Sequence, residues 1–142
     1  MIKFIIAEEK PLDEQSQSIV SALLADITSC DWCVCIAKPH HQNLIAKALA
    51  DLYPDRCFLT SQEHLSIGEI FLTETLPQIT DPNRTCVINT LADLMIPTNT
   101  CKLLIEIITD KRQVSRDKYR HYQQQGSKPH VEHLTIVPAS RA

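Results

Sequence analysis

The segment Trp32–Leu52, WCVCIAKPHHQNLIAKALADL, decides the fold because it joins a buried strand directly to an amphipathic helix. Its opening apolar run predicts a strand over Trp32–Ala37. Pro39 then marks the start of a helix, since its fixed φ angle suits the first helical turn. Apolar residues recur after it with helical spacing, at Leu44, Ile45, Ala48, Leu49 and Leu52. Pro54 ends this helix.

The residues before this segment repeat the same pattern. Ile2–Ala7 is a short apolar run and predicts a buried strand, and Pro11 and Asp13 introduce a second helix. That helix carries its own apolar stripe, at Ile19, Val20, Leu23, Leu24 and Ile27. Two strand–helix units in succession are typical of a βαβ arrangement with a parallel sheet. We therefore expect a single α/β domain over residues 1–142, Rossmann-like and three-layered, with a mostly parallel central sheet.

The second half of the chain alternates apolar runs with polar connections, and its middle is less regular. We expect core strands over Thr85–Asn89 and Leu103–Ile108, and a further strand over His133–Val137 at an edge of the sheet. Shorter elements are expected between them: a strand at Cys57–Thr60, a polar loop at Ser61–Ser66, a strand or extended segment at Ile67–Thr75, and a helix at Leu91–Met95 closed by Pro97.

A basic helix is expected over Lys111–Gly126, KRQVSRDKYRHYQQQG, directly after the most apolar run of the chain. The segment holds five of the fourteen Lys and Arg residues of the chain, namely Lys111, Arg112, Arg116, Lys118 and Arg120. At about 100° per residue, one helix face presents four residues within roughly 100°, namely Arg112, Arg116, Tyr119 and Arg120. Three guanidiniums therefore surround one aromatic ring.

The expected core contacts of this helix are Val114 and Tyr122, which lie away from the centre of that arc, and Gly126 stands where a left-handed C-terminal cap is expected. Two interpretations of the basic face stay open. It is either a binding surface for an acidic partner or a set of solvated charges on an ordinary terminal helix.

The composition of the chain argues against several functions. A formal net charge of −3 disfavours broad nucleic-acid binding, which needs a domain-wide basic surface. The chain has only two glycines, Gly68 and Gly126, and neither lies in a G-x-G-x-x-G or phosphate-loop context, so we expect no nucleotide-binding loop. The first apolar run is too short for a signal peptide or a membrane span, which favours a cytoplasmic protein.

Cysteine and histidine residues offer two weaker alternatives. Several of the six cysteines lie inside apolar strands, so we interpret them as reduced thiols. Cys30-x-x-Cys33 suggests zinc only if His40 and His41 supply the second ligand pair. His64 lies near Glu63 and Ser66 in the polar middle of the chain, but no nucleophile, base and orienting group occur together. We therefore expect no metal, no cofactor and no catalytic residue.

The C-terminal third resembles a known family. The run Arg116–Tyr122 followed by Gly126 matches the pattern R-x-[RK]-Y-[KR]-x-Y-x-x-x-G of the chi subunit of bacterial DNA polymerase III, a clamp-loader accessory protein. A second match covers Asp51–Ser61, where Phe58 corresponds to a family phenylalanine. Thr60 and Ser61 replace the Pro-His pair that follows it in the family.

This resemblance implies a Rossmann-like domain without nucleotide chemistry that serves as a replication adaptor. Such a subunit grips the acidic C-terminal tail of single-stranded-DNA-binding protein and reaches the clamp loader through a small psi subunit. It meets DNA only indirectly and binds no membrane. The implied tail site consists of Arg112, Arg116, Tyr119, Arg120 and Phe58.

Two other functions stay open from the residues alone. One is a small α/β enzyme that holds an anionic substrate with the same arginines, for which His121 and Tyr122 are the nearby candidate groups. The other is direct binding of single-stranded DNA, which the small number of aromatic residues disfavours.

Overall fold

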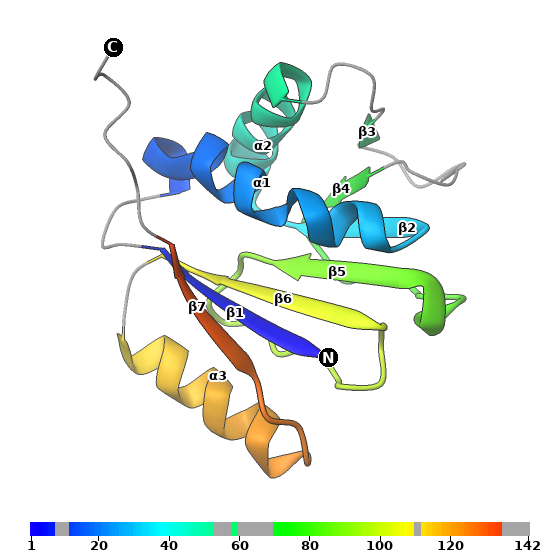
Figure 1. Cartoon of the computed structure of the whole chain (residues 1–142), viewed down its shortest axis with the longest axis vertical. Coiled ribbons are helices and arrows are strands. Elements are labelled where there is room, and N and C mark those ends of the chain that lie inside the picture. The colour runs from blue at the N-terminus through cyan, green and yellow to red at the C-terminus, as the bar shows by residue number, and fades with distance from the viewer. Residues whose placement is uncertain (8–11, 53–57, 60–69, 110–111, 135–142) are drawn as a thin grey trace.

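The computed structural model describes residues 1–7, 12–52, 58–59, 70–109 and 112–134. These residues form an α/β domain with one central sheet (Figure 1). Its elements in chain order are β1 (Ile2–Ala7), α1 (Leu12–Ser29), β2 (Trp32–Ile36), α2 (Pro39–Leu52), β3 (Phe58–Leu59), β4 (Ile70–Thr73), a 3₁₀ turn (Pro82–Arg84), β5 (Thr85–Asn89), β6 (Leu103–Ile108), α3 (Arg112–Gln124) and β7 (His130–Leu134).

The sheet has seven strands in the order β3-β4-β2-β5-β6-β1-β7, and each neighbouring pair runs parallel. Helices α1 and α2 cover one face and α3 covers part of the other (Figure 1). A parallel sheet needs apolar cover on both faces, which explains the near-continuous apolar runs of β2, β5 and β6. The predicted three-layer α/β architecture with a parallel sheet is confirmed.

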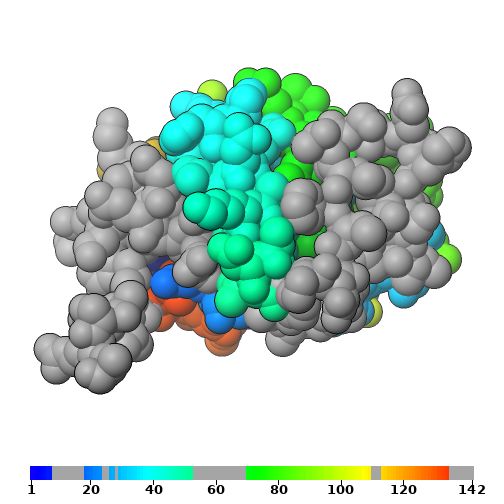
Figure 2. All heavy atoms as spheres, turned by 90° about the horizontal axis from the view of Figure 1, so that it is seen from above, coloured from blue at the N-terminus to red at the C-terminus, as the bar shows by residue number. Residues whose placement is uncertain are grey.

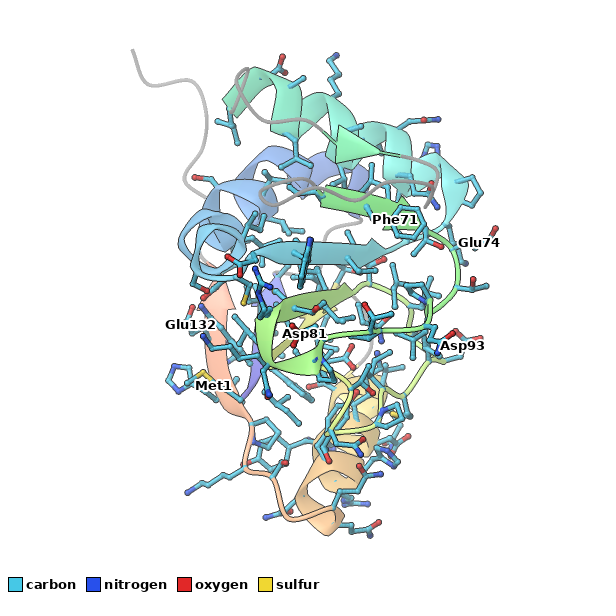
Figure 3. The ribbon with its side chains drawn as sticks, turned by 90° about the vertical axis from the view of Figure 1, so that its right-hand side faces the viewer. Met1, Phe71, Glu74, Asp81, Asp93 and Glu132 are labelled. Carbon is cyan, nitrogen blue, oxygen red and sulfur yellow. The ribbon has the colours of Figure 1, made fainter. Side chains whose placement is uncertain are left out.

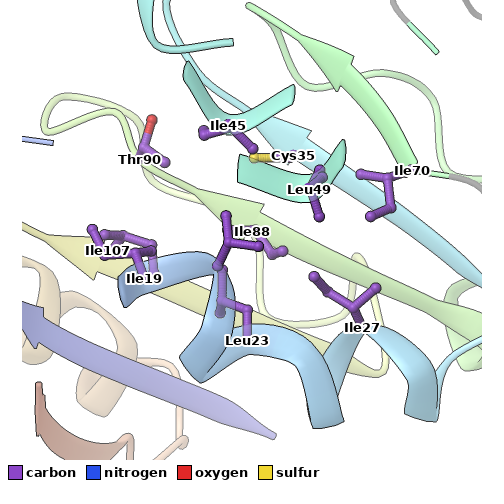
Figure 4. A pocket seen from close by; sticks show the side chains of 11 residues that line it. Ile19, Leu23, Ile27, Cys35, Ile45, Leu49, Ile70, Ile88, Thr90 and Ile107 are labelled. Atoms are coloured by element: carbon purple, nitrogen blue, oxygen red, sulfur yellow. The ribbon is translucent and has the colours of Figure 1, made fainter. Parts of the chain in front are cut away.

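The core has two halves, one on each face of the sheet, and β1 serves both. Ile5 points into the half beneath α1 and α2, whereas Phe4 points into the half beneath α3. Space-filling shows α2 as a cyan-to-green band across the outer surface of its layer (Figure 2). An apolar cavity of about 20 Å³ remains where α1 and α2 meet the sheet (Figure 4). It is large enough for roughly one water, but its apolar lining favours an empty space.

The segment expected to form a helix at Leu91–Met95 does not form one, so that prediction was wrong. It contains a turn at residues 92–93, followed by chain without regular secondary structure. Side chains satisfy its backbone groups in place of helical hydrogen bonds: Lys118 Nζ donates to the Leu91 carbonyl at 2.6 Å, and Asn89 Nδ2 donates to the Leu94 carbonyl at 2.8 Å. The Ile96 N–H donates to the Tyr122 hydroxyl at 3.1 Å.

The last two elements differ slightly from expectation. The helix runs from Arg112 to Gln124, and Gly126 provides the predicted left-handed cap with φ +86°. The N–H groups of Gly126 and Ser127 donate to the carbonyls of Gln123 and Tyr122, which closes the helix end as a Schellman motif. Strand β7 is an edge strand as predicted, but it begins at His130, because that residue pairs with Lys3 of β1.

Among the described residues, no helix combines the length and the apolar character needed to cross a lipid bilayer. The predicted polar loop Ser61–Ser66 lies outside the described residues. The expected strand at Cys57–Thr60 is present as β3, and the expected segment at Ile67–Thr75 contains β4.

Candidate functional site

Helix α3 lies on a row of three side chains that cross the sheet. Asn89 of β5, Glu106 of β6 and Phe4 of β1 are register partners on adjacent parallel strands, so their side chains point to the same face. Glu106 is the one polar residue in the otherwise apolar LLIEII strand, and it is fully buried. A buried carboxylate needs charged or hydrogen-bonding partners, and α3 supplies them.

Glu106 is the centre of a buried polar network. Lys118 Nζ lies 2.9 Å from Oε1, and the side chains of both residues are at most 1% exposed. The Tyr122 hydroxyl donates to Oε2, and Asn89 Nδ2 donates to the same oxygen at 3.3 Å. Together with the backbone contacts of Lys118 and Tyr122 to the segment 91–96, these bonds fix α3 and that segment on the sheet.

Burial shifts the pKa values of both Glu106 and Tyr122 in this network. It raises the pKa of Glu106 above its ordinary value, while the Lys118 cation and the three hydrogen bonds act in the opposite direction. Burial, followed by the nearby Glu106 charge, raises the pKa of Tyr122. The tyrosine therefore stays a neutral hydrogen-bond donor throughout the physiological range.

Phe4 connects this network to the exposed side of α3. Its ring packs edge-on against both Tyr119 and Tyr122, with centroid separations of 6.0 Å in each case. Tyr122 is buried, whereas Tyr119 lies further out and is only partly covered. Tyr119 is thus fixed by the aromatic cluster on its inner side and accessible on its outer side.

A pocket of about 350 Å³ opens between α3, β1 and β7, and we call it the α3 pocket. It is lined by Phe4, Ser115, Arg116, Tyr119, Arg120, Gln123 and Val131. Its apolar part comes from Phe4 and the ring of Tyr119, together with Val131, which is 40% exposed. Arg116 and Arg120 are both exposed and stand one helical turn apart.

The two arginines give this pocket the chemistry needed to hold an anion. Among the residues that the structure describes, no carboxylate forms an ion pair with Arg116 or Arg120. Each planar guanidinium can therefore take a carboxylate or phosphate through two parallel hydrogen bonds. The pocket thus offers an apolar floor together with two cations that have no acidic partner in the described chain.

The structure brings together three of the five predicted site residues, Arg116, Tyr119 and Arg120. Arg112 is the first residue of α3, one turn before Arg116, and its side chain lies outside the described part of the chain. Lys118 belongs to the same basic segment but is buried, so it adds no charge to the surface.

Phe58 does not belong to this pocket, and the prediction that it forms the apolar wall was wrong. It lies in β3, at the opposite edge of the sheet from β7. Five strand spacings separate β3 from β1, which places the two backbones about 24 Å apart. Phe4 and Val131 supply the apolar wall instead. Local sequence patterns do not specify the order of the strands, so they could not indicate this pairing.

The alternative sites suggested by the sequence find little support. The five described cysteines are free thiols, and burial raises the pKa of Cys35 to about 12 and that of Cys101 to about 11, which suppresses the reactive thiolate. Within the described residues, no group of three His, Cys, Asp or Glu side chains is arranged to hold a metal ion. Glu63, His64 and Ser66 lie outside the described chain.

Comparison with known protein families and curated proteins identifies no relative of this chain. No protein-family model matches the sequence, and no curated protein matches it. The chemistry of the α3 pocket and the motif that forms it are therefore the basis for a function.

Proposed function

We propose that this chain is a non-catalytic adaptor of DNA replication that holds the acidic C-terminal tail of a single-stranded-DNA-binding protein in the α3 pocket. The proposal starts from the resemblance of Arg116–Tyr122 and Gly126 to the chi-subunit motif. One observation carries it: Arg116, Tyr119 and Arg120 of that motif line a single pocket with apolar walls.

The chemistry of such a tail fits the pocket. A peptide that ends in an apolar residue needs an apolar recess for the side chain and a cation for the terminal carboxylate. Phe4, Tyr119 and Val131 provide the recess. Arg116 or Arg120 clamps the carboxylate, and the other arginine attracts the aspartates that precede the terminus.

The remaining parts of the proposal follow from the same resemblance. The chain works within the DNA polymerase III holoenzyme and reaches the clamp loader through a psi-like subunit. It contacts DNA only through the bound protein, in keeping with a formal net charge of −3.

The enzyme alternative lacks a supporting observation. Among the described residues that line the α3 pocket, none is a carboxylate, a histidine or a cysteine. Ser115 has no general base beside it in that lining. His121, the nearest histidine in the sequence, contacts Gln125 at 2.9 Å.

Titration with a fluorescent peptide tests the proposal. The probe carries the acidic C-terminus of a single-stranded-DNA-binding protein, and a matched probe lacks the last residue. We expect the full peptide to bind and the truncated one to lose its affinity, because only the former presents the apolar side chain and carboxylate together. We also expect affinity to fall as salt is added, because exposed charges are screened.

Arg116→Ala should weaken binding of the full peptide roughly 10- to 100-fold, since a charge-assisted hydrogen bond contributes about 1.5–3 kcal/mol. Lys47→Ala is the matched control, because it removes one exposed positive charge from α2 on the other face of the sheet. Circular dichroism checks that both variants are folded. Wild-type affinity in the folded Arg116→Ala variant would contradict the assigned site.

A further inference from the structure

Ser115 is a lining residue of the α3 pocket, together with Arg116, Tyr119 and Arg120. It lies in the first turn of α3, and its side chain is half-buried. The described lining offers no general base that could make this hydroxyl a nucleophile. A charged group attached to the Ser115 Oγ would instead change what the two arginines meet.

The sequence before Ser115 carries a charge pattern that protein kinases read. Arg112 stands three residues before the serine, in the order R-Q-V-S, and Lys111 precedes it. A basic residue at this position is what basophilic serine kinases select in their substrates. Of all the serines and threonines in the sequence, only Ser115 has Lys or Arg three residues before it. The sequence pattern and the pocket thus single out the same hydroxyl.

A phosphoryl group on Ser115 suits the charges of the pocket. Phosphoserine carries about −1.5 to −2 charges at pH 7 and three acceptor oxygens. Arg116 and Arg120 have no acidic partner among the described residues, so their guanidiniums are available to such oxygens. The first turn of a helix also favours negative charge, because the helix dipole is positive there.

The described carboxylates nearby do not disturb this charge balance. In the described parts of β1, α3 and β7 they are Asp117 and Glu132, and neither lines the α3 pocket. Asp117 lies two residues after Ser115, about 200° around the helix, and accepts from Gln113 Nε2 at 2.8 Å. Glu132 points to the face of β7 away from α3 (Figure 3) and lies 3.3 Å from Lys3 Nζ.

We propose that Ser115 accepts a phosphoryl group from ATP through a basophilic serine kinase, and that the phosphoserine closes the α3 pocket to the acidic tail. The Ser115 Oγ forms a bond to the γ-phosphorus of ATP while the bond from that phosphorus to the bridging oxygen of ADP breaks. ADP leaves, and the hydroxyl proton passes to the catalytic base of the kinase. This regulation rests on the function proposed above, because it acts on the same pocket.

The phosphoserine and the tail compete for the same donors. Its oxygens take the guanidinium groups of Arg116 and Arg120 that a tail carboxylate needs. The aspartates of the tail then meet a negative charge in place of two positive ones, so both the clamp and the electrostatic attraction are lost.

The place of Ser115 in α3 lets a kinase reach it without unfolding the domain. Kinases bind the acceptor segment as extended chain, so the first turn of the helix has to open. Helix ends fray readily. The later turns stay on the sheet, because Lys118 and Tyr122 bind the buried Glu106.

Incubating the full chain with Mg²⁺, ATP and the catalytic subunit of a basophilic serine kinase tests the modification itself. We expect one phosphoryl group per chain by intact mass, located at Ser115 by peptide fragmentation and absent from Ser115→Ala. Arg112→Gln should slow the reaction at least about tenfold, because the kinase loses a charge contact. Lys128→Gln is the matched control, since it removes an exposed cation from the loop after α3 and should leave the rate unchanged.

Titration with the full tail peptide measures the consequence. The phosphorylated chain should bind it roughly 10- to 100-fold more weakly than the unmodified chain, the effect of losing one charge-assisted contact. Ser115→Asp and Ser115→Asn have nearly the same shape and differ in charge. Ser115→Asp should therefore bind the tail more weakly than Ser115→Asn.

Phosphorus NMR reports on the arginine contact without the peptide. The second ionisation of phosphoserine ordinarily has a pKa of about 6, and nearby guanidiniums should lower it. Arg116→Ala should bring this pKa back towards its ordinary value in the phosphorylated chain.

Three results would overturn the inference. They are the absence of a phosphoryl group on Ser115, an unchanged tail affinity after phosphorylation, and a phosphate pKa that Arg116→Ala leaves unchanged. Failure of the proposed function looks different, because the unmodified chain then does not bind the tail peptide at all. In that case the NMR titration alone decides whether the phosphoserine occupies the arginines.

Discussion

Replacing Lys118 by Met should destabilise the protein strongly at neutral pH and much less in mild acid. The substitution keeps a long apolar stem but removes the ammonium group that lies 2.9 Å from Glu106 Oε1. It also leaves the Leu91 carbonyl without its 2.6 Å donor. Breaking one half of a buried ion pair is far more costly than losing a surface pair, because the remaining charge stays buried without compensation.

The size of the destabilisation in Lys118→Met follows from the cost of protonating the Glu106 carboxyl group. With its ordinary pKa of 4.5, a glutamate costs about 3.4 kcal/mol to protonate at pH 7, at about 1.36 kcal/mol per pH unit. This 3.4 kcal/mol is the largest destabilisation that the unpaired carboxylate can cause. If burying its charge would cost more than that, Glu106 takes up a proton instead. The lost hydrogen bond to Leu91 adds about 1 kcal/mol. We therefore expect the free energy of unfolding to fall by about 4 kcal/mol at pH 7.

The sign of the pH dependence is fixed by linkage. Without Lys118 the folded-state pKa of Glu106 rises further above its unfolded value, so the folded variant keeps a proton that the unfolded chain releases. Stability is then highest below the unfolded pKa and falls as pH rises towards the folded one. At pH 5.5 protonation costs only about 1.4 kcal/mol, so the expected loss shrinks to about 2.4 kcal/mol. In the wild type the contribution of Glu106 to stability also falls as pH rises, because burial raises the pKa of Glu106 there too. The Lys118 cation opposes this pKa shift.

Urea denaturation of the wild type and the variant at pH 7 and pH 5.5 measures this effect. The control is the double variant Lys118→Met with Glu106→Gln, in which no unpaired charge remains. It should be more stable than Lys118→Met alone at pH 7 and should lose the excess pH dependence. A loss below about 1 kcal/mol at pH 7, or an equal loss at both pH values, would refute the reasoning about a buried, charged pair.

Three further substitutions, at two positions, test neighbouring features by the same denaturation assay. Tyr122→Phe should lower the free energy of unfolding by about 1.5–3 kcal/mol. It removes both the hydroxyl that donates to the Glu106 carboxylate and the acceptor of the Ile96 N–H. An unchanged free energy of unfolding would show that this hydroxyl does not support the network. Gly126→Ala should cost about 1 kcal/mol from backbone strain alone, since φ is +86° and the added Cβ meets no described atom beyond the neighbouring residues within 4 Å. Gly126→Asn should cost less than Gly126→Ala, because Asn tolerates this conformation better, and the reverse order would contradict a left-handed cap.

The layered α/β fold could be predicted because each of its main elements has its own local signal. The apolar runs of β2, β5 and β6 and the helical stripe of α2 depend only on neighbouring residues. The order of the strands depends on which runs meet in space, and the sequence carries no local signal for it. Phe58 entered the site through the family resemblance alone, and no local signal could show that its strand lies at the far edge of the sheet. Arg116, Tyr119 and Arg120 share one helix face, which the helical period predicts directly, and they line one pocket.

The segment 91–96 shows a second limit of predicting structure from local sequence. Its composition suits a short helix, but its backbone groups are bound by Asn89, Lys118 and Tyr122, which lie on other elements. A helix of so few residues gains little from its own hydrogen bonds, so tertiary contacts decide its conformation. Such contacts could be anticipated only after the buried network was known.

The network itself did leave a signal in the sequence. Val114 and Tyr122 were expected on the inner face of α3, and Lys118 lies midway between them, four residues from each. A lysine on an inner face requires a buried acidic partner, and the strand LLIEII just before the helix contains one glutamate among five apolar residues. Taken together, the two irregularities predict the Glu106–Lys118 pair, although neither one does so alone.

This pair also explains how the cations of the α3 pocket stay available. Turning α3 by one residue would move Lys118 off Glu106 by about 100° and carry Tyr119 towards the carboxylate, so the network resists rotation of the helix. Arg116 and Arg120 are then held outward next to Phe4 and Tyr119 without an acidic partner of their own among the described residues. Within the described part of the chain, a ligand that meets them breaks no ion pair and finds the helix already formed. The buried Glu106–Lys118 pair thus fixes the orientation of α3, and the two arginines on its outer face are arranged before a ligand binds.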